Sequence, residues 1–323
     1  MYPETMNSIL EKLGKTGIVP VIKIDDAEKA VPLAKALAAG GVPCAEITFR
    51  TAQGEEAIRR IAGEAPEVLV GAGTVLTVDQ VDRAIGAGAQ FIVSPGFNPA
   101  VVSHCQRKGI PITPGCANPS DIEQALEFGL EAVKFFPAEQ AGGLEYIKAV
   151  SAPYPNLKFI PTGGIHAGNI ARYIAFDKVL ACGGSWMAGA DLINAGEFEK
   201  ITALSREAVL ALLGFSVAHI GINTGGHEMA APAAALFNSL FGFALKEGNG
   251  AVFAGNILEL VTTTAPGTHG HIAIATNTIA RAIAHLERGG IALDHANARK
   301  DAQGNVRAIY LKEEILGFAV HLV

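Results

Sequence analysis

The residues best suited to covalent chemistry lie in the stretch Ala132–Glu139, which reads A-V-K-F-F-P-A-E. Its one cation, Lys134, is flanked by Val133, Phe135 and Phe136. An ammonium group in apolar surroundings is costly, so such a lysine is usually paired or neutral. A neutral amine is a nucleophile that forms a Schiff base with a carbonyl carbon. The alternative is a structural lysine at a strand end, with its amine extended to solvent.

A second group of polar residues stands in the segment E-I-T-F-R-T, Glu46–Thr51. Glu46, Thr48 and Arg50 alternate along the chain, so on a strand they point to the same side. A glutamate that faces a neutral lysine and a carbonyl substrate can move protons. The planar fork of an arginine suits a carboxylate or a phosphate. The alternative for Glu46 and Arg50 is a buried ion pair.

Two glycine pairs, Gly163–Gly164 and Gly183–Gly184, each follow a predicted strand. Glycine lets backbone N–H groups approach a ligand closely, and such bare donors hold an anion. Ordinary strand-end turns are the alternative. Two pairs after adjacent strands favour a phosphate site.

The elements that must position these residues form a regular series up to about Ser205, in which short apolar runs alternate with helical patterns. Eight strands are predicted, at Ile18–Ile24, Cys44–Phe49, Val68–Thr74, Phe91–Pro95, Ile110–Thr113, Ala132–Phe136, Lys158–Thr162 and Val179–Cys182. Helices are predicted between them, at Asp26–Ala39, Gly54–Ala62, Val78–Ala87, Pro99–Lys108, Pro119–Phe128, Gly143–Ser151 and Ala167–Phe176, because their apolar residues recur every three or four positions. Three of these segments have a predicted capping residue near their start, namely Asp26, Asn98 and Ser120.

This alternation predicts a closed parallel (β/α)8 barrel. A doubly wound sheet is the competing fold, but no G-x-G-x-x-G follows the first strand. Chemistry in such barrels takes place at the C-terminal ends of the strands. The unusual residues described above gather at those ends.

Six motifs in this region, in this order, resemble the 2-keto-3-deoxy-6-phosphogluconate/4-hydroxy-2-oxoglutarate aldolase family over about residues 5–205. They are E-I-T-F-R-T (Glu46–Thr51), G-A-G-T-V-L (Gly71–Leu76), S-P-G (Ser94–Gly96), V-K-F-F-P-A-E (Val133–Glu139), P-T-G-G-I (Pro161–Ile165) and G-G-S-W-M (Gly183–Met187). The resemblance implies a class I aldolase that needs no metal or other cofactor, on a barrel that usually forms a homotrimer.

The resemblance also implies roles for individual residues. Lys134 is expected to form the Schiff base, and Glu46 to act as general acid and base through water. Arg50 and Thr74 are expected to bind the substrate carboxylate, and Pro95 to line the pyruvate pocket. The residues expected to bind the phosphate are Gly163, Gly164, Gly184 and Ser185. The implied reaction cleaves 2-dehydro-3-deoxy-6-phosphogluconate to pyruvate and glyceraldehyde 3-phosphate. The alternatives are 4-hydroxy-2-oxoglutarate, which yields glyoxylate, and the galactonate epimer.

The composition of the chain disfavours several other classes of function. The 323 residues suggest about two domains; half of them are hydrophobic and 17% are charged, which fits a compact globular protein. A net charge of -6 provides no basic footprint for nucleic acid. No apolar run reaches membrane-spanning length and no signal-peptide pattern opens the chain. Four scattered cysteines favour a reduced, cytoplasmic protein.

A second domain is predicted over residues 215–323, after a barrel domain at 1–205 and a linker helix at 206–214. Its predicted order is strand–helix–three strands, given twice, which suggests an internal duplication. The first unit comprises Phe215–Asn223, Glu228–Phe241, Phe243–Glu247, Ala251–Ala254 and Ile257–Thr263. The second comprises His271–Ala275, Thr278–Glu287, Ala292–His295, Val306–Lys312 and Gly317–Val323.

This order resembles the vicinal-oxygen-chelate fold of glyoxalase I and extradiol dioxygenases. The fragments A-H-I-G-I-N, I-L-E-L-V, G-H-I-A-I-A and F-A-V-H-L-V place His219, Glu259, His271 and His321 where that family has its four metal ligands. The resemblance therefore implies a divalent transition metal such as zinc, nickel, manganese or iron. The family often has glutamate at the last position, where this chain has His321.

Alternatives for the second domain stay open. His227, His269 and His295 are nearby alternative ligands, and a lone histidine on a strand is usually only hydrogen-bonded. A metal centre could serve a second activity or a sensor of a metabolite. Without a metal, the domain would be a binding module or a structural, oligomerisation module. A barrel that only binds ligands is disfavoured because Lys134 and Glu46 are both present.

Overall fold

The computed structural model describes the backbone of residues 4–323 and the side chains of residues 8–323. Residues 1–3 of the predicted barrel domain lie outside the described residues. The chain divides into two compact units, and the division falls between Leu212 and Leu213. Within residues 4–323, no helix has the length and apolar character needed to span a membrane.

The first unit is built on eight parallel strands. They are β1 (Ile18–Ile22), β2 (Cys44–Thr48), β3 (Leu69–Gly73), β4 (Ile92–Val93), β5 (Ile112–Thr113), β6 (Ala132–Phe135), β7 (Lys158–Pro161) and β8 (Cys182–Gly184). Six form a sheet in the order β5-β4-β3-β2-β1-β8, and β6 pairs with β7. Bridges Gly115–Lys134 and Thr162–Gly183 join the two sheets on both sides, which closes the ring. The predicted barrel order is confirmed, and the doubly wound alternative is wrong because its sheet would stay open.

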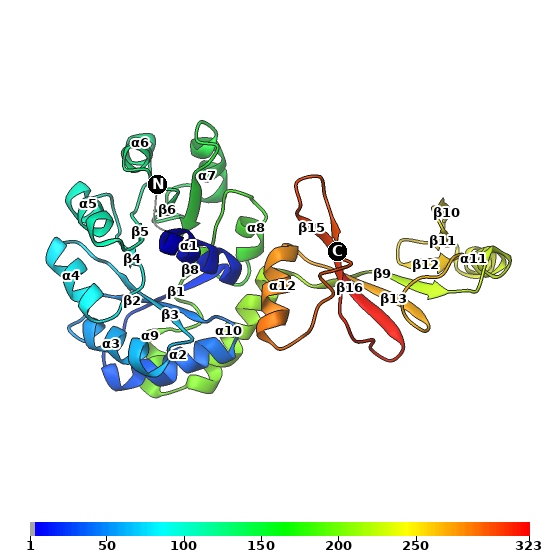
Figure 1. Ribbon diagram of the computed structural model, residues 1–323, viewed down its shortest axis with the longest axis horizontal. Helices are drawn as coiled ribbons and strands as arrows, with labels where there is room; N and C mark the ends of the chain where they lie inside the picture. Colours follow the sequence, from blue (N-terminus) through cyan, green and yellow to red (C-terminus); the bar gives the residue numbers. More distant parts are fainter. Residues whose placement is uncertain (1–3) are drawn as a thin grey trace. The chain divides into compact units, whose positions relative to one another are not determined.

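Helices surround these strands (Figure 1). They are α1 (Glu4–Thr16), the short 3-10 helix η1 (Ala27–Lys29), α2 (Ala30–Ala39), α3 (Gly54–Glu64), α4 (Val78–Gly86), α5 (Pro99–Lys108), α6 (Pro119–Glu127), α7 (Gly143–Ser151), α8 (Ile170–Ile174), α9 (Ala190–Ala195) and α10 (Phe198–Leu213). Each predicted barrel helix has a counterpart among them, because the periodic apolar residues pack against the strands.

Two of the three predicted capping residues cap their helices, and one does not. Asp26 accepts from the amide of Glu28, and Asn98 accepts from that of Ala100, as predicted. The predicted cap Ser120 is wrong, since Asn118 caps α6 by accepting from the amide of Asp121. Pro119 takes the first helical position, where a missing N–H costs nothing, so the cap must precede it.

Helix α1 covers the end of the barrel where the strands begin. Its Ile9 and Leu13 belong to one buried cluster with Val19, Cys44 and Leu69, near the starts of β1, β2 and β3. This apolar plug keeps solvent out of the N-terminal end of the barrel. Access to the interior is left to the opposite end, at the C-terminal ends of the strands.

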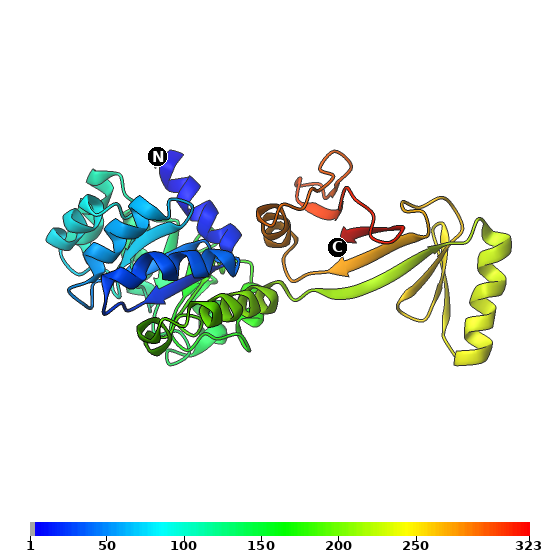
Figure 2. The ribbon, with the colours of Figure 1, turned by 90° about the horizontal axis from the view of Figure 1, so that it is seen from below.

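The second unit is one eight-stranded mixed sheet with two helices (Figure 2). Its elements are β9 (Ser216–Asn223), α11 (His227–Phe241), β10 (Leu245–Gly248), β11 (Ala251–Ala254), β12 (Leu258–Val261), β13 (Gly270–Ala275), α12 (Ile279–Arg288), β14 (Arg299–Lys300), β15 (Val306–Tyr310) and β16 (Phe318–Leu322). The sheet order is β10-β11-β12-β9-β13-β16-β15-β14. The strand–helix–three-strand pattern therefore occurs twice, and β9 and β13 join the two repeats at the centre.

Two predicted elements differ from the structure. The strand predicted at Ala292–His295 is reduced to a single bridge between Leu293 and Leu311, and β14 supplies the ladder strand instead. Residues 206–213, predicted as part of the linker helix 206–214, continue α10, and all of them except Leu213 belong to the first unit. An unbroken run of helix-forming residues after Phe198 offers nothing that would end the helix earlier.

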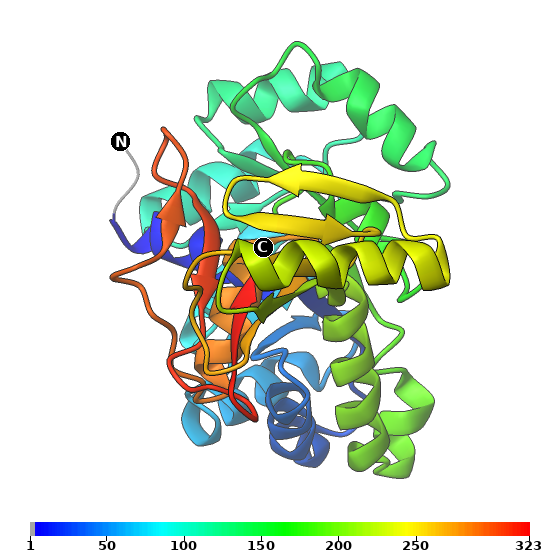
Figure 3. The ribbon, with the colours of Figure 1, turned by 90° about the vertical axis from the view of Figure 1, so that its right-hand side faces the viewer.

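Helix α11 lies along strands β11 and β12 (Figure 3). Its Ala230 and Ala234 form a small buried cluster with Val252 and Leu260. The small alanine side chains let the helix approach the sheet closely. The helix also leaves large apolar side chains exposed, namely Met229, Leu236, Leu240 and Phe241.

Candidate active site and candidate metal centre

Lys134 on β6 and Glu46 on β2 meet inside the barrel. The Lys134 Nζ donates a hydrogen bond to Glu46 Oε1 over 3.3 Å. The two residues are only 6% and 2% exposed. The Lys134 Nζ also lies 5.6 Å from the centre of the Phe136 ring, close enough for a cation–π contact. The alternative of a lysine extended to solvent is therefore wrong.

A small cavity adjoins this pair. It measures about 10 Å³, roughly enough for one water molecule, and Glu46, Lys134, Thr113 and Thr162 supply its polar lining. Neither threonine was among the predicted site residues. In the sequence, each of these threonines could have been recognised as a hydroxyl side chain at the end of a predicted strand, in the segments T-P-G and P-T-G-G.

Gly73 at the end of β3 makes room for the Glu46 carboxylate. A Cβ at position 73 would lie 2.2 Å from Glu46 Oε1 and 2.7 Å from its Cγ. Contacts under 3.0 Å do not occur at real Cβ atoms, so the carboxylate would have to move. The glycine of G-A-G-T thus helps to set the position of Glu46.

Thr74, the next residue, has a left-handed backbone with a φ of 56°. This conformation is a genuine outlier for a β-branched residue, and such strain gathers at functional sites. The backbone therefore singles out the residue for which the resemblance implies contact with the substrate carboxylate.

Arg50 is exposed just beyond β2, and its Nε donates to Thr48 Oγ1 over 3.2 Å. The Thr48 hydroxyl in turn donates to the carbonyl of Ile22. Within the described part of the chain, no carboxylate pairs with Arg50. The alternative of a buried Glu46–Arg50 ion pair is wrong, because Lys134 pairs with Glu46. Pro95, after β4, is half-buried.

Gly163 and Gly164 follow β7, whereas Gly183 and Gly184, predicted to follow a strand, are the last residues of β8. The two pairs lie side by side, because Thr162 and Gly183 form a bridge. Gly163 and Gly164 have φ values of 101° and 78°, a conformation that favours glycine. Among residues 4–323, no acceptor takes the backbone N–H of Gly163, Gly164 or Ser185. These amides, together with the exposed Ser185 hydroxyl, are available to bind an anion.

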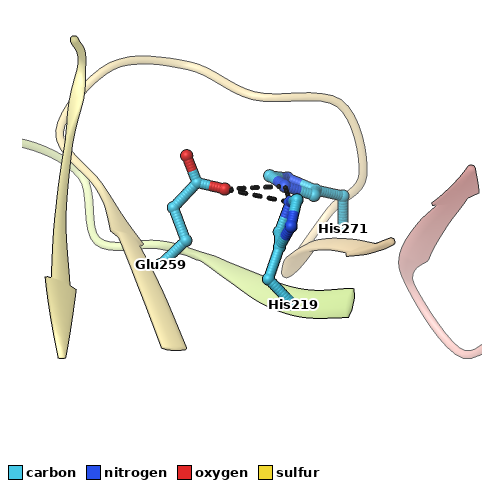
Figure 4. A group of neighbouring side chains, drawn as sticks. All are labelled: His219, Glu259 and His271. Atoms are coloured by element: carbon cyan, nitrogen blue, oxygen red, sulfur yellow. Dashed lines mark hydrogen bonds and ion pairs between the residues drawn. The ribbon is translucent and has the colours of Figure 1, made fainter. Parts of the chain in front are cut away.

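A second cluster lies in the second unit, where Figure 4 shows His219, Glu259 and His271 with their polar atoms converging. The distance from His219 Nε2 to His271 Nε2 is 3.1 Å. Glu259 Oε2 lies 3.1 Å from His271 Nε2 and 3.2 Å from His219 Nε2. Neighbouring ligands around a metal with bonds of about 2.1 Å are roughly 3 Å apart, so this donor set fits a divalent transition metal.

Strand register explains why these side chains meet. His219 lies opposite Ala273, His271 lies opposite Gly221, and Gly221 lies beside Glu259. Partners directly across a sheet share a face, so all three donors project to the same side. A Cβ on Gly221 would lie 2.1 Å from the His271 ring, so only glycine leaves the imidazole its place.

His321 projects from β16 to the same face, because it lies beside Ala273. Its ring centre is 5.3 Å from that of His271 and 5.8 Å from that of His219. Burial lowers the pKa of His321 to about 4, helped by the neighbouring charges of His271, His219 and Arg299. Burial also lowers the pKa of His219.

The other candidate histidines stand outside this cluster. His295 is exposed and pairs with Glu287 over 2.6 Å. His269 is exposed and packs its ring against Phe318. His227 begins α11 and is not among the described residues whose donor atoms converge. The geometry thus selects His219, Glu259 and His271 among the predicted ligands.

Comparisons with known proteins address the barrel. The family model described as "KDPG and KHG aldolase" matches residues 9–204. A protein of Treponema pallidum named 2-dehydro-3-deoxy-phosphogluconate aldolase is 53% identical over 204 residues, which are 63% of this chain and 97% of that protein. The chain belongs to the KDPG and KHG aldolase family.

Solved structures give the same relationship. The KDPG aldolase of Legionella pneumophila, captured with pyruvate as a covalent carbinolamine, is 37% identical with a TM-score of 0.60 and covers 62% of this chain and 97% of its own. The 2-keto-3-deoxy-6-phosphogluconate aldolase of Zymomonas mobilis, solved with 3-phosphoglycerate, is 38% identical with a TM-score of 0.57. It covers 63% of this chain and 94% of its own.

Proposed function

We propose that this chain is a Schiff-base aldolase that cleaves 2-dehydro-3-deoxy-6-phosphogluconate to pyruvate and glyceraldehyde 3-phosphate, with Lys134 as the nucleophile. The observation that carries this assignment is the buried Lys134 amine, 3.3 Å from the Glu46 carboxylate inside the barrel. Relatives that bear the aldolase name, one of them captured with covalently bound pyruvate, support the same reaction.

The reaction uses these two groups in turn. The neutral amine of Lys134 attacks the C2 keto carbon, and loss of water from the carbinolamine leaves a protonated imine. Glu46 accepts the C4 hydroxyl proton, the C3–C4 bond breaks, and its electron pair moves into the imine to form an enamine. Glyceraldehyde 3-phosphate leaves. Protonation of the enamine carbon and hydrolysis of the new imine release pyruvate and restore the amine.

Substrate contacts follow from the positions around this pair. Arg50 and Thr74 are assigned to the carboxylate, and Pro95 to the wall of the pyruvate pocket. Gly163, Gly164, Gly184 and Ser185 are assigned to the phosphate, which the unused amides of Gly163, Gly164 and Ser185 support. A phosphorylated ligand in the Zymomonas mobilis relative points the same way. Cleavage of 4-hydroxy-2-oxoglutarate and of the galactonate epimer are the alternative activities.

Borohydride reduction in the presence of pyruvate tests the assignment of Lys134. The intact protein should gain the mass of one reduced pyruvyl group, carried by the peptide that contains Lys134. Lys134→Ala should gain none and should lose turnover. Lys148→Ala, which removes an exposed lysine paired with Glu145, is the matched control and should behave like the parent protein. An adduct on Lys134→Ala would refute the assignment.

We further propose that residues 215–323 form a vicinal-oxygen-chelate-like domain with a metal centre at His219, Glu259 and His271. The repeated strand–helix–three-strand order and the convergence of three donor atoms support it. When bound, a divalent transition metal would supply Lewis acidity to a small-molecule ligand. The three residues would hold it, and Gly221 would keep the His271 ring in place.

Elemental mass spectrometry of the purified full-length protein tests the metal centre. About one transition metal per chain is expected, and a His219→Ala/His271→Ala variant should lose it while aldolase activity stays unchanged. Absence of metal after incubation with zinc, nickel, manganese or iron(II) would reject the centre.

A structural or assembly role for the second unit is the other candidate, and the exposed apolar side of α11 favours it. The trimer expected for the barrel is likewise a proposal, and it is tested by the molar mass that light scattering gives for the protein eluted from a size-exclusion column. Leu240→Glu should change the measured mass only if α11 contributes to assembly.

A cytoplasmic location is proposed as well, since all four cysteines are free and buried.

A further inference from the structure

His321 stands beside the three converging donors without joining them. In the described part of the chain, His219, Glu259 and His271 are the only group of three or more His, Cys, Asp or Glu side chains whose ligand atoms all lie within 4.8 Å of one another. His321 shares their face of the sheet, and its ring centre is 5.3 Å from that of His271 and 5.8 Å from that of His219, about the 5.2 Å between those two rings themselves. It therefore borders the site, and what sets it apart is that its donor atoms are not part of the convergent group. The fourth predicted ligand is therefore placed to line the site.

Tyr310 extends this lining. It lies opposite His321 in the β15–β16 ladder, so its side chain projects to the same face. The two rings pack with their centres 4.5 Å apart and a tilt of 43°. An imidazole and a phenol thus form one continuous wall beside the cluster, and both can donate or accept a hydrogen bond.

Among the described residues, one ring nitrogen of the wall and one of the cluster have no partner. The Nδ1 atoms of His271 and His321 are buried and take part in no hydrogen bond among the described residues. His321 is only 5% exposed, so bulk water does not satisfy it. A buried polar atom left unpaired costs about 1–3 kcal/mol, so such atoms in native proteins are usually paired with ordered water, an ion or a ligand. A small polar ligand at the cluster would supply that partner for His321.

Charge indicates which kind of ligand. A divalent ion held by one carboxylate and two neutral imidazoles retains a net charge of about +1 and has open coordination positions. Arg299 adds positive charge on this face, since it lies opposite Ala308 in the β14–β15 ladder, two residues from Tyr310. These positive charges favour an anion, and a small carboxylate also offers oxygens to the metal and to the wall.

We propose that His321 does not bind the metal and instead, together with Tyr310, binds a small carboxylate that completes the coordination of an ion held by His219, Glu259 and His271. This inference rests on the metal centre proposed above. Pyruvate is a member of this ligand class that the barrel of the same chain would produce.

Cobalt(II) provides the test, because its visible absorption changes when a ligand joins the metal. The full-length protein is loaded with cobalt, metal content is measured, and pyruvate or acetate is titrated while the spectrum is recorded. Acetate cannot form an imine, so it separates the metal site from Lys134. His321→Ala and Tyr310→Phe should keep about one cobalt per chain and bind either carboxylate roughly tenfold more weakly than the parent protein. His295→Ala, which removes an exposed histidine, should change neither quantity.

The outcomes separate the two proposals. Loss of cobalt from His321→Ala would make His321 a ligand and overturn the inference, with the metal centre intact. Unchanged carboxylate binding in both variants would overturn it as well. A parent protein that takes up no cobalt would reject the metal centre itself. His219→Ala serves as the variant that should lose the metal in any case.

Discussion

The Lys134 amine and the Glu46 carboxylate are 3.3 Å apart, although 88 residues separate them along the chain. They come from β6 and β2, strands that are not neighbours in the ring, so each reaches into the interior of the barrel. Helix α1 excludes solvent from the end of the barrel where the strands begin, and both residues are nearly fully buried. A carboxylate held against a buried amine can take up and return protons during imine chemistry.

Replacement of Glu46 tests that role. Glu46→Gln keeps the shape of the side chain but removes the proton acceptor, so kcat should fall by about 10²–10⁴-fold. Pyruvate should still be trapped on Lys134 by borohydride, more slowly than in the parent protein. Glu145→Gln, at an exposed ion pair with Lys148, is the control. An unchanged kcat would remove Glu46 from the mechanism.

Gly73→Ala tests the same carboxylate without altering it. The new methyl group would lie 2.2 Å from Glu46 Oε1, so the carboxylate must move away from the amine. We expect kcat to fall at least tenfold while the far-ultraviolet circular dichroism spectrum is retained. Gly63→Ala on α3, where a Cβ meets nothing within 4 Å, should leave kcat unchanged. Equal activity of the two variants would show that Gly73 does not position Glu46.

Ser185→Asp tests the proposed phosphate site after β8. A carboxylate placed beside the free amides should repel a phosphate, because like charges about 4 Å apart cost roughly 1–4 kcal/mol at a protein surface. The KM for the phosphorylated sugar acid should rise tenfold or more, measured with lactate dehydrogenase as the coupling enzyme. Cleavage of 4-hydroxy-2-oxoglutarate, which has no phosphate, should change little. A similar loss with both substrates would place the phosphate elsewhere.

Gly221→Ala tests the metal centre without removing any ligand atom. Its methyl group would occupy the space of the His271 imidazole, 2.1 Å from the ring. Position 221 lies in a strand with ordinary φ, so alanine should not strain the backbone. Bound metal should drop by at least tenfold, as measured by elemental mass spectrometry, while aldolase activity persists. Full metal occupancy in Gly221→Ala would mean that the metal does not require the His271 imidazole at this position. Gly189→Ala, in open space, is the control.

The sequence by itself determined the order of elements in both units. Apolar residues recur with the period of strands or helices, and this local signal placed all eight barrel strands and most helices within a few residues. It also singled out Lys134, because a cation inside an apolar strand is unusual whatever surrounds it. Boundaries were less well determined: α10 continued past Ser205, and the strand expected at Ala292–His295 became a single bridge.

Only the tertiary structure decided which of these residues meet. Glu46 could have paired with Arg50, four positions away, yet ring closure brings it to Lys134. Four predicted ligands share one face of the second sheet, but distances join His219, Glu259 and His271 and leave His321 beside Tyr310. Gly73 and Gly221 matter because of the side chains that fill the space above them. Periodicity along a chain is local, whereas distances across a barrel or a sheet depend on strand register and closure, which no single segment encodes.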